Sequence, residues 1–310
     1  MMILSSDIHL STPSAVTIGC FDGVHRGHQM LVQMMVCQAR QRGLKPIAVT
    51  FDRLPRQLFD PTFHPQLLST LEEKTACLKE LGVEEVIVLP FTHQLAALSA
   101  EAFIREILRD RLSVELLVTG YDNRFGHDRS ESFDDYVRYG QRLGIDVVRG
   151  DVAMLDDQMA VSSTIIRQLL ADEGKVEAMP EVLTRRYSLS GRVVSGEHIG
   201  HELGFPTANV EPDSKEKLIP ASGAYAVWAV VDGHRMPAMM NIGTRPTFEG
   251  KQQTLEVHIL QEVGNLYGQS ITVEFVSRLR AEQRFDTREA LIAQLEYDRQ
   301  TTEQLLLNNK

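Results

Sequence analysis

The chain has 310 residues, 43% of them hydrophobic and 24% charged, which is typical of a globular protein of about two domains. Its formal net charge of −10 argues against nucleic-acid binding through a broad basic face. No apolar run approaches the roughly 20 residues that cross a bilayer, and the N-terminus lacks a signal-peptide pattern. The three cysteines show no metal-ligand spacing. Reduced thiols are therefore expected, in a cytoplasmic protein without membrane or nucleic-acid partners.

Strand-like and helix-like segments alternate from residue 15 to about residue 175. The expected strands are near-continuous apolar runs, typical of parallel strands buried on both faces: Ala15–Phe21, Pro46–Phe51, Glu85–Phe91, Glu115–Tyr121 and Ile145–Val152. Capping-box pairs, Thr70 with Glu73 and Ser132 with Asp135, mark two helix starts between them. The alternation predicts a doubly wound parallel sheet that binds ligands at the carboxyl ends of its strands.

The densest motif is GCFDGVHRGH at residues 19–28, directly after the first expected strand. Its glycines let the backbone approach a ligand, and a helix expected to begin near His28 would offer N–H groups to a phosphate. His25 and His28 can both point at one phosphoryl group and stabilise the charge of its transition state. Alone, the motif also fits a surface loop with idle histidines. Its place at the end of a strand favours phosphate chemistry, although neither common nucleotide fingerprint follows that strand.

Two further segments fit the same site. VTGYDNRFG, residues 118–126, ends the fourth expected strand, where a ligand crevice should open. VSSTIIR, residues 161–167, begins a helix whose hydroxyls can cap it or contact phosphate. The cap is the commoner role, but Arg167, one turn into the helix, can bind phosphates through bidentate hydrogen bonds.

After about residue 184 the pattern changes to short alternating segments, separated by Gly, Pro and Asn, that predict an antiparallel barrel or sandwich: Tyr187–Val194, Ala224–Val231, Thr254–Leu260 and Ser270–Val276. A last helix is expected near Thr287, with Asp286 as its N-cap and Glu289 three residues on. We therefore expect two domains, residues 1–183 and 184–310.

The second half carries its own candidate site. Glycines at positions 196, 200 and 204 could wrap phosphates with backbone amides, and Thr207 and Asn209 offer oxygen ligands suited to Mg²⁺. Glu256 shares one strand face with His258 and could accept a proton from an attacking hydroxyl. Each feature alone also fits a simpler structure, namely a flexible loop with a proline turn and a solvent-facing glutamate.

Seven segments, in the same order, resemble the bacterial bifunctional riboflavin kinase/FAD synthetase family: GCFDGVHRGHQ, VTGYDNRFG, VSSTIIR, LGFPTANV, NIGTRPTF, LEVHIL and LYGQSITVEFVSRLRAEQRF. The resemblance spans nearly the whole chain. It implies a Rossmann-like nucleotidylyltransferase domain with a parallel sheet, followed by a riboflavin kinase domain. The kinase domain would be a six-stranded antiparallel β-barrel with a C-terminal helix.

The resemblance also implies the reactions. The C-terminal domain would phosphorylate riboflavin to FMN with ATP and Mg²⁺, and the N-terminal domain would adenylylate FMN to FAD and release pyrophosphate. The implied catalytic residues are Glu256, His25, His28 and Arg167. Of these, Glu256 would activate the riboflavin hydroxyl. The implied nucleotide-binding residues are Gly19, Phe21, Gly23, Ser162, Ser163, Thr164, Gly196 and Gly204. Asp122, Asn123 and Phe125 would lie by the flavin, and Thr207 and Asn209 would hold Mg²⁺. The oligomeric state stays open, a homo-oligomer included.

Three positions depart from the family pattern. His201 replaces an arginine, Asp128 replaces an asparagine, and Phe51–Pro55 departs from FDPHP. The loop that follows, to about Ser69, is expected to be a mobile flap with altered contacts. Asp128 motivates one rival, a kinase with an inactive adenylyltransferase domain. Two others are a flavin-responsive binding protein and an adenylyltransferase for a different phosphate ester. The intact histidines and Glu256 argue against the binding protein, and the β-rich half argues against the different ester.

Overall fold

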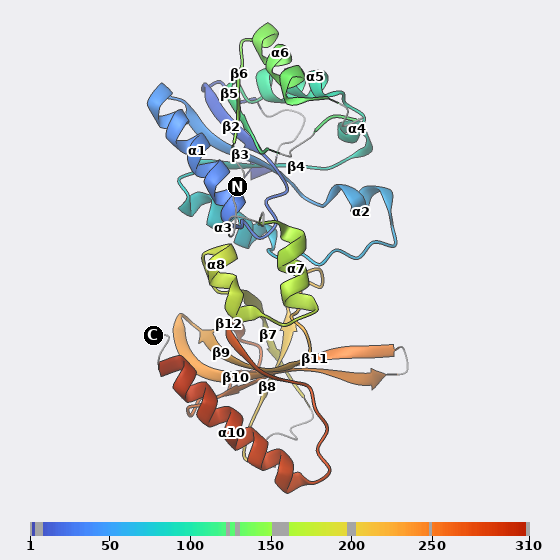
Figure 1. The fold of residues 1–310 in the computed structure, drawn as a ribbon, viewed down its shortest axis with the longest axis vertical. Coiled ribbons are helices and arrows are strands. Elements are labelled where there is room, and N and C mark those ends of the chain that lie inside the picture. Colours follow the sequence, from blue (N-terminus) through green and yellow to red (C-terminus); the bar gives the residue numbers. More distant parts are fainter. Residues whose placement is uncertain are drawn as a thin grey trace. The chain divides into compact units, whose positions relative to one another are not determined.

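The structure is a computed structural model that describes residues 2–3, 9–121, 125–127, 131–150, 161–196, 203–247 and 250–307. The chain divides into two compact units, Met1–Ser163 and Thr164–Lys310 (Figure 1). This division falls before the expected change at residues 183 and 184, because the contacts group the helical segment after Ser163 with the second unit. The domain bounds inferred from the sequence pattern stay a prediction.

The first unit is built on a parallel sheet (Figure 1). Its described strands lie in the order β1(Met2–Ile3), β4(Glu85–Leu89), β3(Lys45–Phe51), β2(Ser14–Ile18), β5(Val114–Thr119) and β6(Asp146–Arg149). Every neighbouring pair is parallel, so the predicted α/β fold is confirmed. The five strands expected from apolar runs are all present, whereas the short β1 was not expected because two residues carry no detectable pattern.

Helices cover both faces of this sheet. On one face, residues of α1 and α3 pack against alternate strand residues, and on the other face α5, η1 and α6 do so. The helices of this unit are α1(Arg26–Arg42), α2(Pro55–Phe59), α3(Leu71–Glu80), α4(His93–Ala96), α5(Ala100–Phe103), the π-helical turn η1(Ile104–Arg109) and α6(Phe133–Leu143). Burial on both faces explains why the strands are continuously apolar.

Two helix starts were predicted correctly. Thr70 and Glu73 form a capping box on α3, and Ser132 and Asp135 form one on α6. The start of α1 was predicted too late. The helix begins at Arg26, and His25 is its N-cap, so His28 lies in the first turn instead of at the boundary.

The second unit contains a closed antiparallel barrel, as predicted. Its six described strands follow the order β10(His234–Thr247), β11(Gly250–Ile259), β8(Ala208–Pro212), β7(Ser188–Val194), β12(Ser270–Ala281) and β9(Gly223–Val231). The alternating pattern did not identify β8 and β10 individually. Pro237 and Pro246 lie inside β10 and Pro212 ends β8, and proline is an unfavourable residue in a strand pattern.

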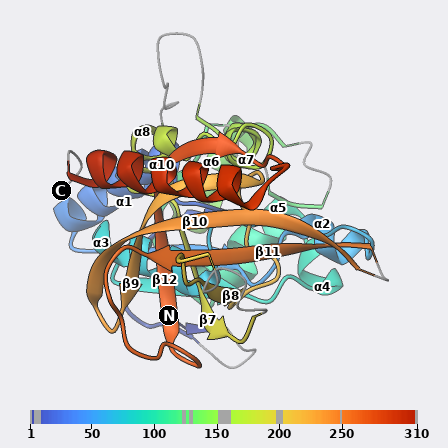
Figure 2. The same ribbon diagram turned by 90° about the horizontal axis from the view of Figure 1, so that it is seen from below.

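Helices complete this unit: α7(Ser163–Ala171), which begins at the last residue of the first unit, the 3₁₀ turn η2(Val176–Ala178), α8(Met179–Leu183) and α10(Arg288–Leu307). α10 packs along β9, β10 and β12, and Figure 2 shows it lying across the barrel. Thr287 caps this helix, because its Oγ1 accepts the N–H of Ala290 at 3.1 Å; the prediction of Asp286 as N-cap was wrong. Among the described residues, no helix has the length and apolar composition needed to span a membrane.

A substitution at Gly191 can test how closely the barrel strands pack. It lies in β7 opposite Pro212 of β8 and Ile271 of β12, and a Cβ there would lie 2.3 Å from the carbonyl oxygen of Glu211. We expect Gly191→Ala to lower the free energy of unfolding by about 1–3 kcal/mol, because the strands must shift apart. Denaturant unfolding measures this loss. Gly264→Ala is the matched control, since its Cβ would meet nothing within 4 Å, and equal stability of the two variants would contradict the packing argument.

Candidate active sites

The turn between β2 and α1 has a strained backbone. Phe21, Gly23 and Val24 have φ angles of 48°, 80° and 41°. A positive φ is costly for a β-branched residue such as Val24, so surrounding contacts must hold it. The side chains of Phe21 and Val24 are fully buried in the core beneath α1. Phe21 therefore supports the turn from inside, and its ring meets the His28 ring edge-on at 5.3 Å.

Hydrogen bonds from the segment before α3 hold this turn in place. The buried Asp22 carboxylate accepts the backbone N–H groups of Leu68 and Ser69 at 2.9 and 3.1 Å. In return, the N–H of Gly23 donates to Ser69 Oγ at 2.9 Å. The loop expected to be a mobile flap thus contains α2, and its end is bonded to the turn between β2 and α1.

His25 and His28 lie side by side, as the motif predicted. Their rings stack with centroids 3.7 Å apart and an interplanar angle of 20°. His25 Nδ1 accepts the backbone N–H of His28 at 3.4 Å, so it caps α1. A nitrogen that accepts this bond carries no proton. Neutral His25 therefore has its ring proton on Nε2.

The environment of His28 favours its neutral form. Its Nδ1 is buried without a hydrogen-bond partner among the described residues, although the residue as a whole is only partly buried. Burial, and then the nearby His25 and Lys74, hold the pKa of His28 well below its usual value of 6.5. At neutral pH the ring therefore offers one N–H donor and no charge.

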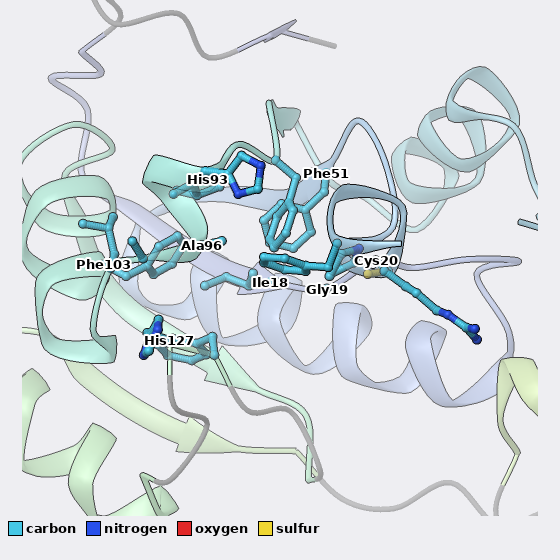
Figure 3. Close-up of a pocket in the computed structure, with 17 residues that line it drawn as sticks. Ile18, Gly19, Cys20, Phe51, His93, Ala96, Phe103 and His127 are labelled. Atoms are coloured by element: carbon cyan, nitrogen blue, oxygen red, sulfur yellow. The ribbon is translucent and has the colours of Figure 1, made fainter. Parts of the chain in front are cut away.

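An apolar cavity of about 730 Å³ opens beside this turn, at the carboxyl ends of β2, β3 and β4. Figure 3 shows Ile18, Gly19 and Cys20 along it, with Phe51, His93, Phe103 and His127 around the same space. Phe125, predicted to lie at a ligand, lines the cavity too. The backbone of Phe125 exchanges hydrogen bonds with the Tyr136 hydroxyl, and the two rings stack at 4.3 Å.

Sequence reasoning missed most of the aromatic lining. Phe51 and Phe91 each follow the apolar core of a strand, and Phe103 lies in α5. An aromatic residue at the carboxyl end of a parallel strand was the available signal, but the neighbours of each strand are not fixed by the sequence pattern. Only the sheet order brings the ends of β2, β3 and β4 together.

The other residues predicted for this site lie in different parts of the structure. Gly19 lines the cavity, and Ser163 Oγ donates to the carbonyl oxygen of Asp22 at 3.0 Å. Ser162 directly precedes α7, and Thr164 and Arg167 lie in α7 within the second unit. Predictions for Asp122, Asn123, Asp128, Gly200 and His201 lie outside the described residues.

In the barrel, the strand register brings the predicted residues together. Glu256 of β11 pairs with Asn209 of β8 on one side and with Asn241 of β10 on the other. Asn241 pairs with Ala224, which in turn pairs with Arg280 of β12. Directly opposite residues in a sheet project from the same face. A row of facing residues therefore crosses the barrel at this level, in which Glu256 lies between Asn209 and Asn241, and Ala224 separates these polar residues from Arg280.

The alternation predicted for β11 is confirmed. Leu255, Val257 and Ile259 are buried, whereas Glu256 and His258 are only partly buried on the other face. Arg280 of β12 is held against α10, because its Nε donates to the buried carboxylate of Asp298 in that helix at 2.9 Å. The opposite end of the row is thus anchored by an ion pair.

Two cavities meet beside this row. One, of about 340 Å³, is lined by residues of the row and by apolar residues that include Met239, Phe285, Leu291 and Leu295. The other, of about 700 Å³, lies along residues 257–267 with Gly204 and Val193. Thr207 and His258 line both cavities. A group held at Thr207 would therefore lie between the occupants of the two cavities.

His258 fixes the segment that carries Thr207. Its Nδ1 donates to the carbonyl oxygen of Pro206 at 2.8 Å, and its ring meets Phe205 edge-on at 5.3 Å. Burial is the main reason that the pKa of His258 lies below 6.5. The sequence placed His258 on the face of Glu256 but gave no sign of this contact, which spans distant parts of the chain.

The residues present fit Mg²⁺. A Cβ on Gly196 would lie 1.9 Å from Asn209 Nδ2, so glycine is needed there for the Asn209 amide to occupy this position. No group of three or more His, Cys, Asp or Glu side chains in the described part of the chain could hold a metal ion. Mg²⁺ does not require such a group, because it usually takes few protein oxygens and completes its octahedron with waters and phosphates.

The capping role of His25 can be separated from any other role. We expect His25→Ala to lower the free energy of unfolding by about 1 kcal/mol, because α1 loses its N-cap acceptor. His25→Asn should recover most of that stability, since its side-chain oxygen can accept the same N–H. Denaturant unfolding of the two variants measures the difference. If both lost the same stability, the hydrogen bond to His28 would not contribute.

Comparison with known proteins agrees with both halves of the structure. Residues 7–165 match the family model described as FAD synthetase, and residues 183–306 match the one described as riboflavin kinase. The bifunctional riboflavin kinase/FMN adenylyltransferase of Escherichia coli strain K12 is 39% identical over 92% of this chain and 90% of its own length. That of Pseudomonas fluorescens is 39% identical over 89% of this chain and 87% of its own.

A solved structure gives the same result for the fold. A protein described as a macrolide-efflux protein from Streptococcus pneumoniae superposes with a TM-score of 0.90 at 30% identity, covering 97% of this chain and 98% of its own. The sequence relatives match both halves of the chain in one continuous stretch. The chain therefore belongs to the bifunctional riboflavin kinase/FMN adenylyltransferase family.

Proposed function

We propose that the barrel phosphorylates riboflavin to FMN and that the first unit joins FMN to AMP from a second ATP, giving FAD. The observation that supports this proposal is that each unit has its own cluster of side chains suited to phosphate chemistry. The stacked histidines lie at a helix N-terminus in one unit, and Glu256 lies beside Asn209 in the other. Two separate sites allow two successive reactions on one flavin.

In the barrel, we assign riboflavin to the smaller cavity and ATP to the larger one. The smaller cavity has the apolar residues that a flavin ring requires, and Gly204 in the larger one admits phosphates close to the backbone. Glu256 accepts the proton of the riboflavin 5′-hydroxyl as its oxygen attacks the γ-phosphorus of ATP, and ADP leaves. Gly196 and Gly204 would border the phosphates.

Thr207 and Asn209 would hold Mg²⁺ between the two substrates. When bound, the ion would neutralise part of the negative charge on the ATP phosphates. The strand pairing of Asn209 with Glu256 keeps the base next to this position. The carboxylate then receives its proton where the hydroxyl meets the phosphate.

In the first unit, a phosphate oxygen of FMN attacks the α-phosphorus of ATP, and pyrophosphate leaves. The nucleophile is already ionised, so no general base is required. His25 and His28 donate their remaining N–H groups to oxygens of the α-phosphoryl group, and the N-terminus of α1 adds its partial positive charge. The neutral form of His28 suits this role, because a donor is needed and a proton transfer is not.

The aromatic cavity beside the turn would take the flavin ring of FMN. Phe51, Phe91 and Phe125 line it, and Gly19 and Cys20 border both the cavity and the turn. The phosphate of a flavin held there would extend toward the histidines. We assign Ser162, Ser163, Thr164 and Arg167 to the ATP phosphates, with Asp122 and Asn123 by the flavin.

The two reactions should be separable by mutation. Glu256→Gln should lower FMN formation at least ~100-fold, because a general base is lost, while FMN-to-FAD conversion continues. His28→Ala should do the reverse. A chromatographic time course of flavins, started from riboflavin or from FMN with ATP and Mg²⁺, measures both. A parallel loss of both activities in either variant would contradict separate sites. FMN that accumulates without FAD in the unmodified protein would favour the rival with an inactive adenylyltransferase.

The metal assignment has its own test. Thr207→Val keeps the shape of the side chain but removes its oxygen, so half-maximal kinase activity should require several-fold more Mg²⁺. Kinase rates across a Mg²⁺ titration measure this shift. Thr244→Val on the exposed part of β10 is the matched control. An unchanged Mg²⁺ requirement in Thr207→Val would remove Thr207 from the metal site.

We place both reactions in the cytoplasm, where the three free cysteines would stay reduced. ATP, riboflavin and FMN are the partners that this function needs. All three are small molecules. The net negative charge of the chain argues against a nucleic-acid partner.

A further inference from the structure

A lysine lies buried behind the turn between β2 and α1, which we assign to phosphate binding. Lys74 of α3 is only 8% exposed. Its Nζ donates to the carbonyl oxygen of Cys20 at 2.7 Å and to Thr50 Oγ1 at 3.2 Å, and Thr50 Oγ1 donates to the same carbonyl at 3.2 Å. A lysine is rarely buried to this extent, because desolvation of its charge is costly. The position therefore requires an explanation beyond packing.

Within the described part of the chain, the hydrogen bonds of Lys74 reach only uncharged groups. Both hydrogen-bond acceptors, the Cys20 carbonyl and the Thr50 hydroxyl, are uncharged. Burial is the largest effect on Lys74 and lowers its pKa, and the nearby Cys20 and Asp22 act in the opposite direction. The Asp22 carboxylate accepts the Leu68 and Ser69 amides. The ammonium group therefore contributes positive potential at the back of the turn.

The backbone of the same turn is strained, so contacts with surrounding residues must hold it in place. Cys20 precedes Phe21, the first of the residues with positive φ, and Cys20 lines the aromatic cavity on its other side. Asp22 and Gly23 are fixed by the segment before α3, but the Cys20 carbonyl is fixed by Lys74 and Thr50. Lys74 and Thr50 thus both hold the Cys20 carbonyl, which lies between the cavity wall and the histidine turn.

We propose that Lys74 is a positioning residue for FMN adenylylation, which holds the Cys20 carbonyl inward and places a positive charge behind the stacked histidines. The proposal rests on the assignment of adenylylation to the first unit. Lys74 need not touch a substrate. It acts through the shape of the turn and through His28, whose pKa is lowered in part by Lys74.

Three variants in the full chain test this role. Lys74→Met removes the charge and the donor, and adenylylation kcat should fall ~10–100-fold, within the range expected when electrostatic groups near a transition state are lost. Lys74→Gln keeps an N–H donor without the charge and should be intermediate. Lys74→Arg keeps both and should recover the most activity. The riboflavin kinase rate of each variant, measured in the same sample, should not change, and denaturant unfolding of each variant reports whether the first unit is folded.

Lys79→Met is the matched control, because Lys79 is exposed on the same helix. It should leave both reactions unchanged. If Lys74→Met does not fold, Lys74→Gln carries the test alone. A normal adenylylation rate in Lys74→Gln and Lys74→Met, or an equal fall in kinase activity, would overturn the proposal. A failure of the unmodified protein to make FAD would instead contradict the proposed function.

A second readout distinguishes positioning from a merely structural role. Among the described residues, the titratable groups that act on His28 are His25 at the start of α1 and Lys74 on α3. Loss of the Lys74 charge removes a repulsion on the imidazolium, so the pKa of His28 should rise toward 6.5 in Lys74→Met and Lys74→Gln. The ¹⁵N NMR titration of the His28 ring, assigned with His28→Asn, measures this. An unchanged His28 titration in Lys74→Met would overturn the electrostatic part of the proposal.

Discussion

The first site depends on one buried interaction, the acceptance of the Leu68 and Ser69 amides by the Asp22 carboxylate. Asp22 lies in a turn whose flanking residues have positive φ angles, a geometry that relaxes unless the surroundings hold it. The carboxylate ties that turn to the segment leading into α3, and α3 brings Lys74 beneath it. The cap of α1, the stacked imidazoles and the edge of the aromatic cavity all follow from this fixed backbone.

The second site depends on the register of its paired strands and not on a strained backbone. A shift of one residue between β8 and β11 would turn Glu256 and Asn209 to opposite faces. The buried Leu255 and Val257 prevent this shift, because it would expose them to solvent. Gly196 supports the register from the neighbouring segment, where the absence of a side chain makes room for the Asn209 amide. The chemistry of the barrel is thus set by its apolar core.

The two units solve related problems with different chemistry. The riboflavin hydroxyl must lose a proton as it attacks, and in the proposed mechanism Glu256 provides the base. The FMN phosphate has no proton to lose, so we assign hydrogen-bond donors to the first unit, among them His28, whose neutral form is favoured by burial. This difference in the nucleophile explains why one site is built around a carboxylate and the other around imidazoles.

The sequence by itself determined the two fold classes and the capping boxes of α3 and α6, and it supplied the candidate residues of both sites. Continuous apolar runs, alternation and local caps depend on near neighbours in the chain, and such neighbours can be read directly. Local pattern failed where proline interrupted β10 and where β1 was too short. Only the tertiary structure decided that Lys74 lies behind the His25 turn, that Phe51 and Phe125 line one cavity, and that Glu256 faces Asn209. Those contacts join residues far apart in the chain, and strand order, register and burial bring them together.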